Sequence, residues 1–206
     1  MPTSRTRLIT GSAVGALLVA AVVIALTISG SGNTTTRTAS LLPQGVNAPT
    51  GGSTTTFAPA GLGATVTLPA TWTAAPPASG FQYVMESRTA SEEFLGASRQ
   101  SGFVPLSPST VARQREAFLR SIGARITSEA TGTIDGRPAA RLRYLLTSGN
   151  ITVDDSEYDI ITKSTLPVGA SQEQTEYDTI VFVLGAPSNT DRSLLQWIAS
   201  TIRIPT

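Results

Sequence analysis

A run of 21 uncharged, mostly apolar residues, Leu8 to Ile28, lies near the beginning of the chain and directly follows Arg5 and Arg7. In a helix, about 20 apolar residues span the roughly 30 Å hydrocarbon core of a bilayer. Positively charged residues tend to stay on the cytoplasmic side of such a helix. The run therefore predicts a cytoplasmic tail over residues 1–7, a transmembrane helix over residues 8–28, and an extracytoplasmic location for all that follows.

The same run could instead be a cleaved signal peptide. A signal peptide has an apolar region of about 7 to 15 residues, followed by a small-x-small cleavage site. The run here is longer, which favours an uncleaved anchor, although Ser29-Gly30-Ser31 and Thr38-Ala39-Ser40 would suit cleavage. Cleavage would release a secreted domain. A bacterial lipobox anchor requires a cysteine, and the chain has none.

Two regions follow the apolar run. Residues 29–56 are rich in Ser, Gly, Thr and Pro, and such a composition buries too little apolar surface to offset the entropy of ordering. We expect a disordered tether there, on which Thr34–Thr36 and Thr54–Thr56 could carry O-linked glycans. Residues 57–206 form the predicted extracytoplasmic domain. Without cysteines this domain has no disulfides, and about 150 residues suffice for a core of their own.

Charge and residue types exclude several classes of function. Three of the 15 basic residues precede residue 57 and all 14 acidic residues follow it, so the predicted domain carries a net charge of −2. A weakly acidic domain lacks the basic surface that binds nucleic acid. The chain has no histidine or cysteine, which removes Ser-His-Asp and Cys-His catalysis and the imidazole metal sites. Arginine outnumbers lysine strongly, as is typical of GC-rich bacterial genomes.

Periodicity predicts an α+β domain with a mainly antiparallel sheet and helices packed on it. One helix should begin at Ser107-Pro108 and end at Gly123, and a second should run from Ser188 or Asn189 to Ile202. The segment Ile180–Leu184 is apolar on both faces, which indicates a central strand covered on both sides. Alternating patterns predict strands over residues 64–68, 81–86, 124–133, 140–146, 157–163 and 177–184.

Three stretches, in this order and spacing, carry a resemblance: residues 66–72 (VTLPATW), 134–144 (IDGRPAARLRY) and 197–205 (WIASTIRIP). Over roughly residues 62–205 the chain resembles the LpqN-type envelope lipoproteins of actinobacteria, which are similar in fold to PsbP, the extrinsic subunit of photosystem II. The resemblance implies a PsbP-like α/β/α sandwich and a non-enzymatic, often partner-binding role. The chain departs from that family in lacking the lipobox cysteine. The resemblance assigns a function to no residue.

Four arginines are candidates for a ligand or partner surface: Arg113, Arg120, Arg141 and Arg143. The first two lie seven residues apart on the predicted helix, and the other two project from one face of a predicted strand, opposite Leu142 and Tyr144. If they cluster, their guanidinium groups could bind a phosphate or carboxylate bidentately. The alternative is that they are ordinary exposed arginines, balanced by acidic neighbours such as Glu116 and Glu129.

The densest acidic cluster comprises Asp154, Asp155, Glu157 and Asp159. Oxygen ligands can bind Ca²⁺, but the spacing does not match an EF-hand loop, and we expect a solvated loop that enters an edge strand. The same carboxylates offer no fixed pair for glycosidase chemistry. Trp72 and Trp197 are expected to cap the core rather than to form an exposed aromatic platform.

These observations predict a non-catalytic interaction module that is tethered to a bacterial membrane, and the family resemblance implies an actinobacterial one. We expect no cofactor and no metal. The expected partners are the membrane, through Leu8–Ile28, and another envelope protein; a lipid or glycan is the other candidate. The first alternative is a carrier of a lipid or small apolar ligand, which requires a cavity of roughly 300–1,000 Å³ lined by Phe, Val and Leu. A remote alternative is a hydrolase that uses only Ser, Tyr, Arg and carboxylates.

Overall fold

The computed structural model describes residues 39–77, 80–88, 92–167 and 173–205, and it is built around a seven-stranded antiparallel sheet. The predicted transmembrane helix over Leu8–Ile28 and the candidate glycosylation sites Thr34–Thr36 lie outside these residues. No helix within the described ranges is long and apolar enough to cross a membrane. The sheet order is β3 (Trp72–Ala75), β4 (Tyr83–Ser87), β5 (Phe94–Gly102), β9 (Glu173–Pro187), β8 (Ile151–Pro167), β7 (Arg137–Ser148), β6 (Arg125–Ile134).

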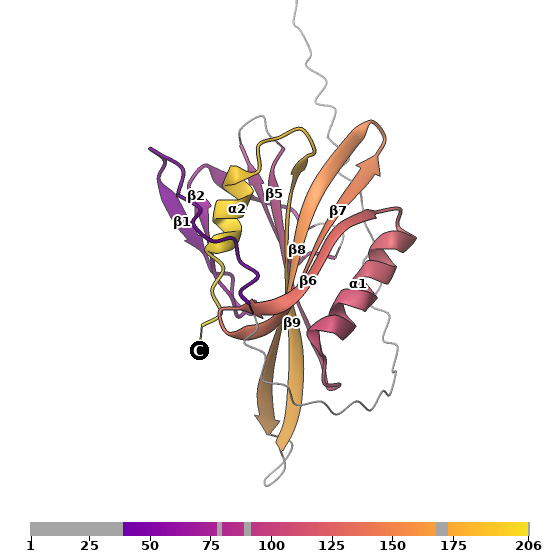
Figure 1. The fold of residues 1–206 in the computed structure, drawn as a ribbon. Helices are drawn as coiled ribbons and strands as arrows, with labels where there is room; N and C mark the ends of the chain where they lie inside the picture. The colour runs from indigo at the N-terminus through magenta and orange to yellow at the C-terminus, as the bar shows by residue number, and fades with distance from the viewer. Residues whose placement is uncertain (1–38, 78–79, 89–91, 168–172, 206) are drawn as a thin grey trace, which may run out of the picture.

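One helix packs on each face of the sheet (Figure 1). Helix α1 (Pro108–Ser121) lies over β6, β7 and β8, whereas α2 (Ser193–Ser200) lies on the other face with the two-stranded sheet of β1 (Thr54–Phe57) and β2 (Val66–Pro69). Strand alternation sends neighbouring residues to opposite faces. The α+β architecture predicted from the sequence is therefore confirmed.

The larger core lies on the α2 face. Phe182 on β9, Leu68 on β2 and Ile198 on α2 are fully buried in it, and Trp72 and Trp197 keep only 4% and 6% of their surface exposed. The tryptophans therefore belong to the core, as predicted. Strand β9 lies between β5 and β8, and the run from Asp178 to Ala186 is buried throughout, which confirms the prediction of a central strand.

Local signals in the sequence predict the beginning of α1 correctly, but not the beginning of α2. The Ser107 side chain accepts a hydrogen bond from the Thr110 amide at 3.2 Å, and proline occupies the first turn, as predicted. The second helix begins only at Ser193, because β9 continues to Pro187 and a turn follows it. Arg192 occupies the N-cap position and makes no side-chain capping bond. The prediction of a cap at residue 188 or 189 is therefore wrong.

Residues 39–46, which we call the N-terminal strap, pack against the domain. Leu41 and Leu42 are 7% and 9% exposed, and the Leu41 amide donates to Thr133 O at 2.9 Å while the Thr133 amide donates to Ala39 O at 3.0 Å. The strap fits because β6 has a glycine beside it: a Cβ at Gly132 would lie 2.4 Å from Ala39 O.

The prediction of a disordered tether over residues 29–56 is therefore wrong for its second part. Leu41 and Leu42 bury apolar surface in the core, although most of the residues around them are Ser, Thr, Gly and Pro. In addition, residues 54–57 form β1. The domain begins before residue 57. Thr54, Thr55 and Thr56 are exposed on β1, and their glycosylation stays a prediction.

Strand β8 corrects the interpretation of the acidic cluster. It begins at Ile151 and lies between β7 and β9, so Asp154 to Asp159 belong to an internal strand and not to a solvated loop before an edge strand. Asp155, Glu157 and Asp159 are 4%, 0% and 0% exposed on the face that α1 covers. The density of acidic residues favoured a solvated loop, but these residues lie within β8, and the helix connecting β5 to β6 covers that face.

Candidate functional site

The structure separates the four candidate arginines into two pairs on opposite faces of the sheet. Arg141 and Arg143 on β7 lie opposite Tyr158 and Ser156 of β8, on the face that carries α2. Arg113 and Arg120 lie on α1, on the other face, and both are exposed.

The two helical arginines make local bonds. Arg113 Nε donates to the carbonyl oxygen of Ser109 at 3.3 Å, and Arg120 Nη2 lies 2.7 Å from Glu116 Oε1. The Arg120–Glu116 pair agrees with the alternative interpretation of exposed, charge-balanced arginines. Because the two pairs lie on opposite faces of the sheet, Arg113 and Arg120 do not form one ligand surface with Arg141 and Arg143.

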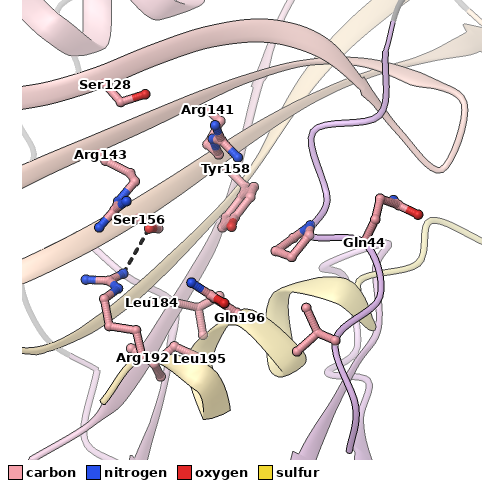
Figure 2. Close-up of a pocket in the computed structure, with 12 residues that line it drawn as sticks. Gln44, Ser128, Arg141, Arg143, Ser156, Tyr158, Leu184, Arg192, Leu195 and Gln196 are labelled. Atoms are coloured by element: carbon pink, nitrogen blue, oxygen red, sulfur yellow. Dashed lines mark hydrogen bonds between the residues drawn. The ribbon is translucent and has the colours of Figure 1, made fainter. Parts of the chain in front are cut away.

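Arg141 and Arg143 instead share a pocket with Arg192, a residue that no local pattern in the sequence marks (Figure 2). We call these three residues and the cavity they line the arginine pocket. Its volume is about 320 Å³. Strands β6 to β9 form one wall, α2 forms a second, and the strap closes a third side with Pro43, Gln44 and Val46.

The three arginines reach the pocket from two parts of the chain, β7 and the beginning of α2. Alternation along β7 puts Arg141 and Arg143 on one face, two residues apart. Arg192 follows the turn after β9 and precedes the first turn of α2, which packs back over the sheet. Because β8 separates β7 from β9, residues about 50 positions apart in the sequence meet above the same strand. The position of Arg192 beside the other two follows from the strand order and from the face of the sheet on which α2 packs.

One carboxylate serves two of the three guanidinium groups. Asp154 lies 3.0 Å from Arg143 Nη2 and 2.7 Å from Arg192 Nη1, and Arg192 Nη2 also donates to Ser156 Oγ at 2.9 Å. Within the described residues no other carboxylate pairs with these arginines. Three positive charges facing one negative charge leave an excess of two, which favours an anion in the pocket.

Arg141 has the most unused hydrogen-bonding capacity. Its Nη1 donates to the carbonyl oxygen of Leu41 at 3.4 Å, a long bond to a neutral acceptor. The buried Nε atoms of Arg141 and Arg143 have no partner among the described residues. Burial raises the pKa of the neighbouring Tyr158, against the opposing effect of the three arginines, so its phenol stays neutral. A guanidinium with free donors fits a carboxylate or phosphate in a bidentate geometry.

The α1 face holds a different electrostatic feature. Arg115 binds Glu157 through two bonds, Nε to Oε1 at 2.5 Å and Nη2 to Oε2 at 3.0 Å. The pKa of Asp155 is raised to about 8, mainly by burial. Burial also raises the pKa of Asp159 well above its usual range. In the part of the chain that the structure describes, no three His, Cys, Asp or Glu residues are placed to hold a metal ion.

Comparisons with known proteins show the fold. No protein-family model and no curated protein matches the sequence. The structure is similar to that of LpqN, a protein involved in cell envelope biogenesis of Mycobacterium tuberculosis, with a TM-score of 0.50 and 14% sequence identity over 76% of this chain and 86% of LpqN. It is also similar to cyanobacterial PsbP (CyanoP) from Synechocystis sp. PCC 6803, with a TM-score of 0.51 and 17% identity over 79% of this chain and 99% of that one.

At these identities the likeness concerns the fold and not the residues of a site. It confirms the resemblance to the LpqN and PsbP structures that the three sequence stretches indicated. The chain therefore has a PsbP-like α+β fold.

Proposed function

We propose that this protein is a non-catalytic binding module of a bacterial cell envelope, and that its arginine pocket takes the carboxylate or phosphate group of another envelope component. The observation that carries this proposal is the excess of guanidinium groups over carboxylates in one cavity. Arg141, Arg143 and Arg192 line it, and Asp154 alone pairs with the last two.

Two independent features support the envelope location. The run Leu8–Ile28 has the length and flanking charges of an anchor that leaves the domain outside the cytoplasm. LpqN, which has a similar fold, is involved in cell envelope biogenesis. A binding role without catalysis is supported by the residue types of the pocket. Among the described residues that line it, Tyr158 is the one titratable group besides the three arginines, two of which pair with Asp154.

The pocket also gives a specific reason to keep the carrier hypothesis as the second candidate. Val46, Leu184 and Leu195 line the side of the cavity near the strap and α2. A ligand with an anionic head and a short apolar segment would contact both kinds of wall. A wholly apolar ligand would leave Arg141 without a charged acceptor and the Nε atoms of Arg141 and Arg143 without a partner, which is costly in a partly buried site.

The test is site-specific photo-crosslinking of the full-length protein in its own envelope. A photoreactive residue at Gln196, an exposed residue of α2 in the pocket wall, should capture a discrete component. The same residue at Arg113, exposed on the opposite face, is the matched control. The Gln196 adduct should be lost in the double variant Arg141→Gln/Arg143→Gln.

The identity of the adduct separates the candidates. An acidic protein would support an interaction module, and an anionic lipid or glycan would support the carrier. Adducts that are the same from both positions, or that survive the double substitution, would refute the arginine pocket as the binding surface.

A further inference from the structure

A second cavity lies on the α1 face of the sheet, across from the arginine pocket. Its volume is about 140 Å³, and it is enclosed by the beginning of α1 and by strands β5, β8 and β9. Gln100 and Gln114 are exposed and lie at its rim, so the cavity reaches the surface. Val111 and Val181 provide apolar wall, and Asp159 contributes a carboxyl group from within the sheet.

The Asp159 side chain is the unusual group in this cavity. It is fully buried, and neither of its carboxyl oxygens receives a hydrogen bond from a donor in the described residues. A buried carboxylate is normally paired or hydrogen-bonded, because it is otherwise strongly destabilising. Its neighbour Glu157 follows that rule, since Arg115 binds both of its oxygens. The cavity therefore adjoins a buried carboxyl group to which no donor of the described residues bonds.

The charges around Asp159 favour a cation as its partner. Asp155, Glu157 and Asp159 share this face of β8, and Arg115, which also lines the cavity, is already bound to both oxygens of Glu157. Burial and then Glu157 raise the pKa of Asp159, which favours its protonated form. That form can donate one hydrogen bond to Glu157, but neither oxygen accepts one from the described residues. The other titratable groups on this face include Asp155 and Lys163 of β8, Tyr144 of β7, Glu129 of β6 and Tyr177 of β9. Lys163 is positively charged, but it is exposed and lies four positions along β8 from Asp159, about 13 Å away.

We propose that this cavity binds a primary ammonium group carried on a short alkyl chain. The ammonium donates to the Asp159 carboxylate and displaces its proton, and the methylene groups contact Val111 and Val181. The volume exceeds that of a single water, about 30 Å³, and suits a ligand of a few heavy atoms. The group could belong to a free amine or to a lysine side chain of a partner, because both offer the same chemistry.

The test is an NMR titration of the full chain in a non-ionic detergent, with n-butylammonium as the probe. The amide signals of Gln114 and Thr179, which line the cavity, should shift saturably. n-Butanol, which has the same length without the charge, should bind at least tenfold more weakly. Nα-acetyl-lysine methylamide distinguishes the sources: binding of this probe supports a lysine side chain, and its exclusion while butylammonium binds supports a free amine.

Two further readouts separate a ligand site from a purely structural carboxyl group. Affinity should rise with pH by up to about tenfold per unit while Asp159 still carries its proton, because the ammonium displaces that proton. Asp159→Asn, which matches the size of the protonated acid, should lower affinity at least tenfold and abolish the pH dependence. The matched control is Asp191→Asn, at a fully exposed carboxylate, which should change neither.

Gln114→Trp provides a variant that leaves Asp159 intact and blocks the rim from an exposed position; it should also weaken binding. The proposal is overturned if butylammonium causes no saturable shift, if butanol binds equally well, or if Asp159→Asn binds like the unmodified protein. Any of these results would mean that the cavity holds water only. None of them bears on the arginine pocket, which lies on the other face.

Discussion

Arg141 on β7 donates a hydrogen bond from Nη1 to the carbonyl oxygen of Leu41 at 3.4 Å, across 100 positions of sequence. The same guanidinium lines the arginine pocket, and the strap that contains Leu41 forms one wall of that pocket. An anion that binds Arg141 would compete with the Leu41 carbonyl for its donors. In the sequence, ten residues separate the strap from the run Leu8–Ile28 that is predicted to enter the membrane.

The first prediction concerns this contact. Arg141→Ala should lower the affinity of the full-length protein for inorganic phosphate at least tenfold, because a charge-assisted bidentate partner is lost. Calorimetric titration at low ionic strength would measure it, since salt screens such a site. Arg113→Ala removes an exposed arginine from the other face and should leave phosphate affinity unchanged. Equal losses in the two variants would argue for a general charge effect and against a site.

The second prediction tests how the strap is held. Gly132→Ala places a Cβ about 2.4 Å from Ala39 O and 2.8 Å from a methyl carbon of Leu41. The strap must shift, and we expect a loss of roughly 1–3 kcal/mol in the free energy of unfolding, as for other overpacked sites. Hydrogen exchange of the Leu41 amide should accelerate, because that amide bonds to Thr133.

Gly102→Ala is the matched control for this substitution. Gly102 also lies in a strand, and a Cβ there would meet nothing within 4 Å. Urea unfolding should separate the two variants. A Gly132→Ala variant as stable as Gly102→Ala, with unchanged exchange at Leu41, would show that the strap does not pack on β6.

The third prediction concerns the buried ion pair under α1. Arg115→Met leaves the Glu157 carboxylate, which is 0% exposed, without its cation. Breaking such a pair costs about 3–5 kcal/mol, and urea unfolding should show a loss of this order. Arg120→Met breaks the Arg120–Glu116 pair, whose arginine is 60% exposed, and should cost no more than about 1 kcal/mol.

A double substitution checks the cause of that loss. Arg115→Met combined with Glu157→Gln removes the charge that the single variant leaves buried, and it should recover most of the lost stability. If the double variant is as unstable as Arg115→Met alone, the cost arises from lost packing of the Arg115 side chain, which also lies 5.0 Å from the centre of the Phe118 ring.

The fourth prediction is a dependence of stability on pH. Burial, together with Glu157 and Asp154, raises the pKa of Asp155 to about 8, against the opposing effect of Arg192. In the unfolded chain an aspartic acid titrates near 3.9. Between these values the folded state holds the proton and the unfolded state does not, so stability falls as the pH rises from about 4 to about 8. Asp159 acts in the same direction.

Urea unfolding at pH 5, 7 and 9 would measure this effect, and the protein should be most stable at pH 5. Asp155→Asn replaces the protonated acid with a neutral group of the same size, and it should flatten the dependence and stabilise the protein at pH 9. Stability that is constant or rises over this range would contradict the assignment of a neutral Asp155.

Local signals predicted much of the fold. The Ser107-Pro108 pair marks the beginning of α1, and the apolar run Ile180–Leu184 identifies the central strand, because capping and strand alternation depend only on neighbouring residues. Short strands were harder to predict. Strand β1 has little apolar content. Strand β3, which begins at Trp72, has only four residues, and its pairing with β4 supplies the hydrogen bonds that so short a strand lacks alone.

The site depended more on long-range pairing. The sequence alone placed Arg141 and Arg143 on one strand face, because successive side chains of a strand alternate. It could not place Arg192 beside them, nor separate them from Arg113 and Arg120, because both facts follow from which face each helix covers. It also predicted a solvated loop for Asp155, Glu157 and Asp159, which are buried in an internal strand.

The chain by itself therefore determined the features that depend on composition and local period: the predicted anchor, the lack of histidine and cysteine, the central strand and the first helix. Tertiary structure decided which charges are buried and which meet. A charged residue is buried when another element covers its face of the sheet. Strand order brings residues together regardless of their distance in the sequence. For this reason the arginine pocket and the buried Asp159 became visible only in the folded domain.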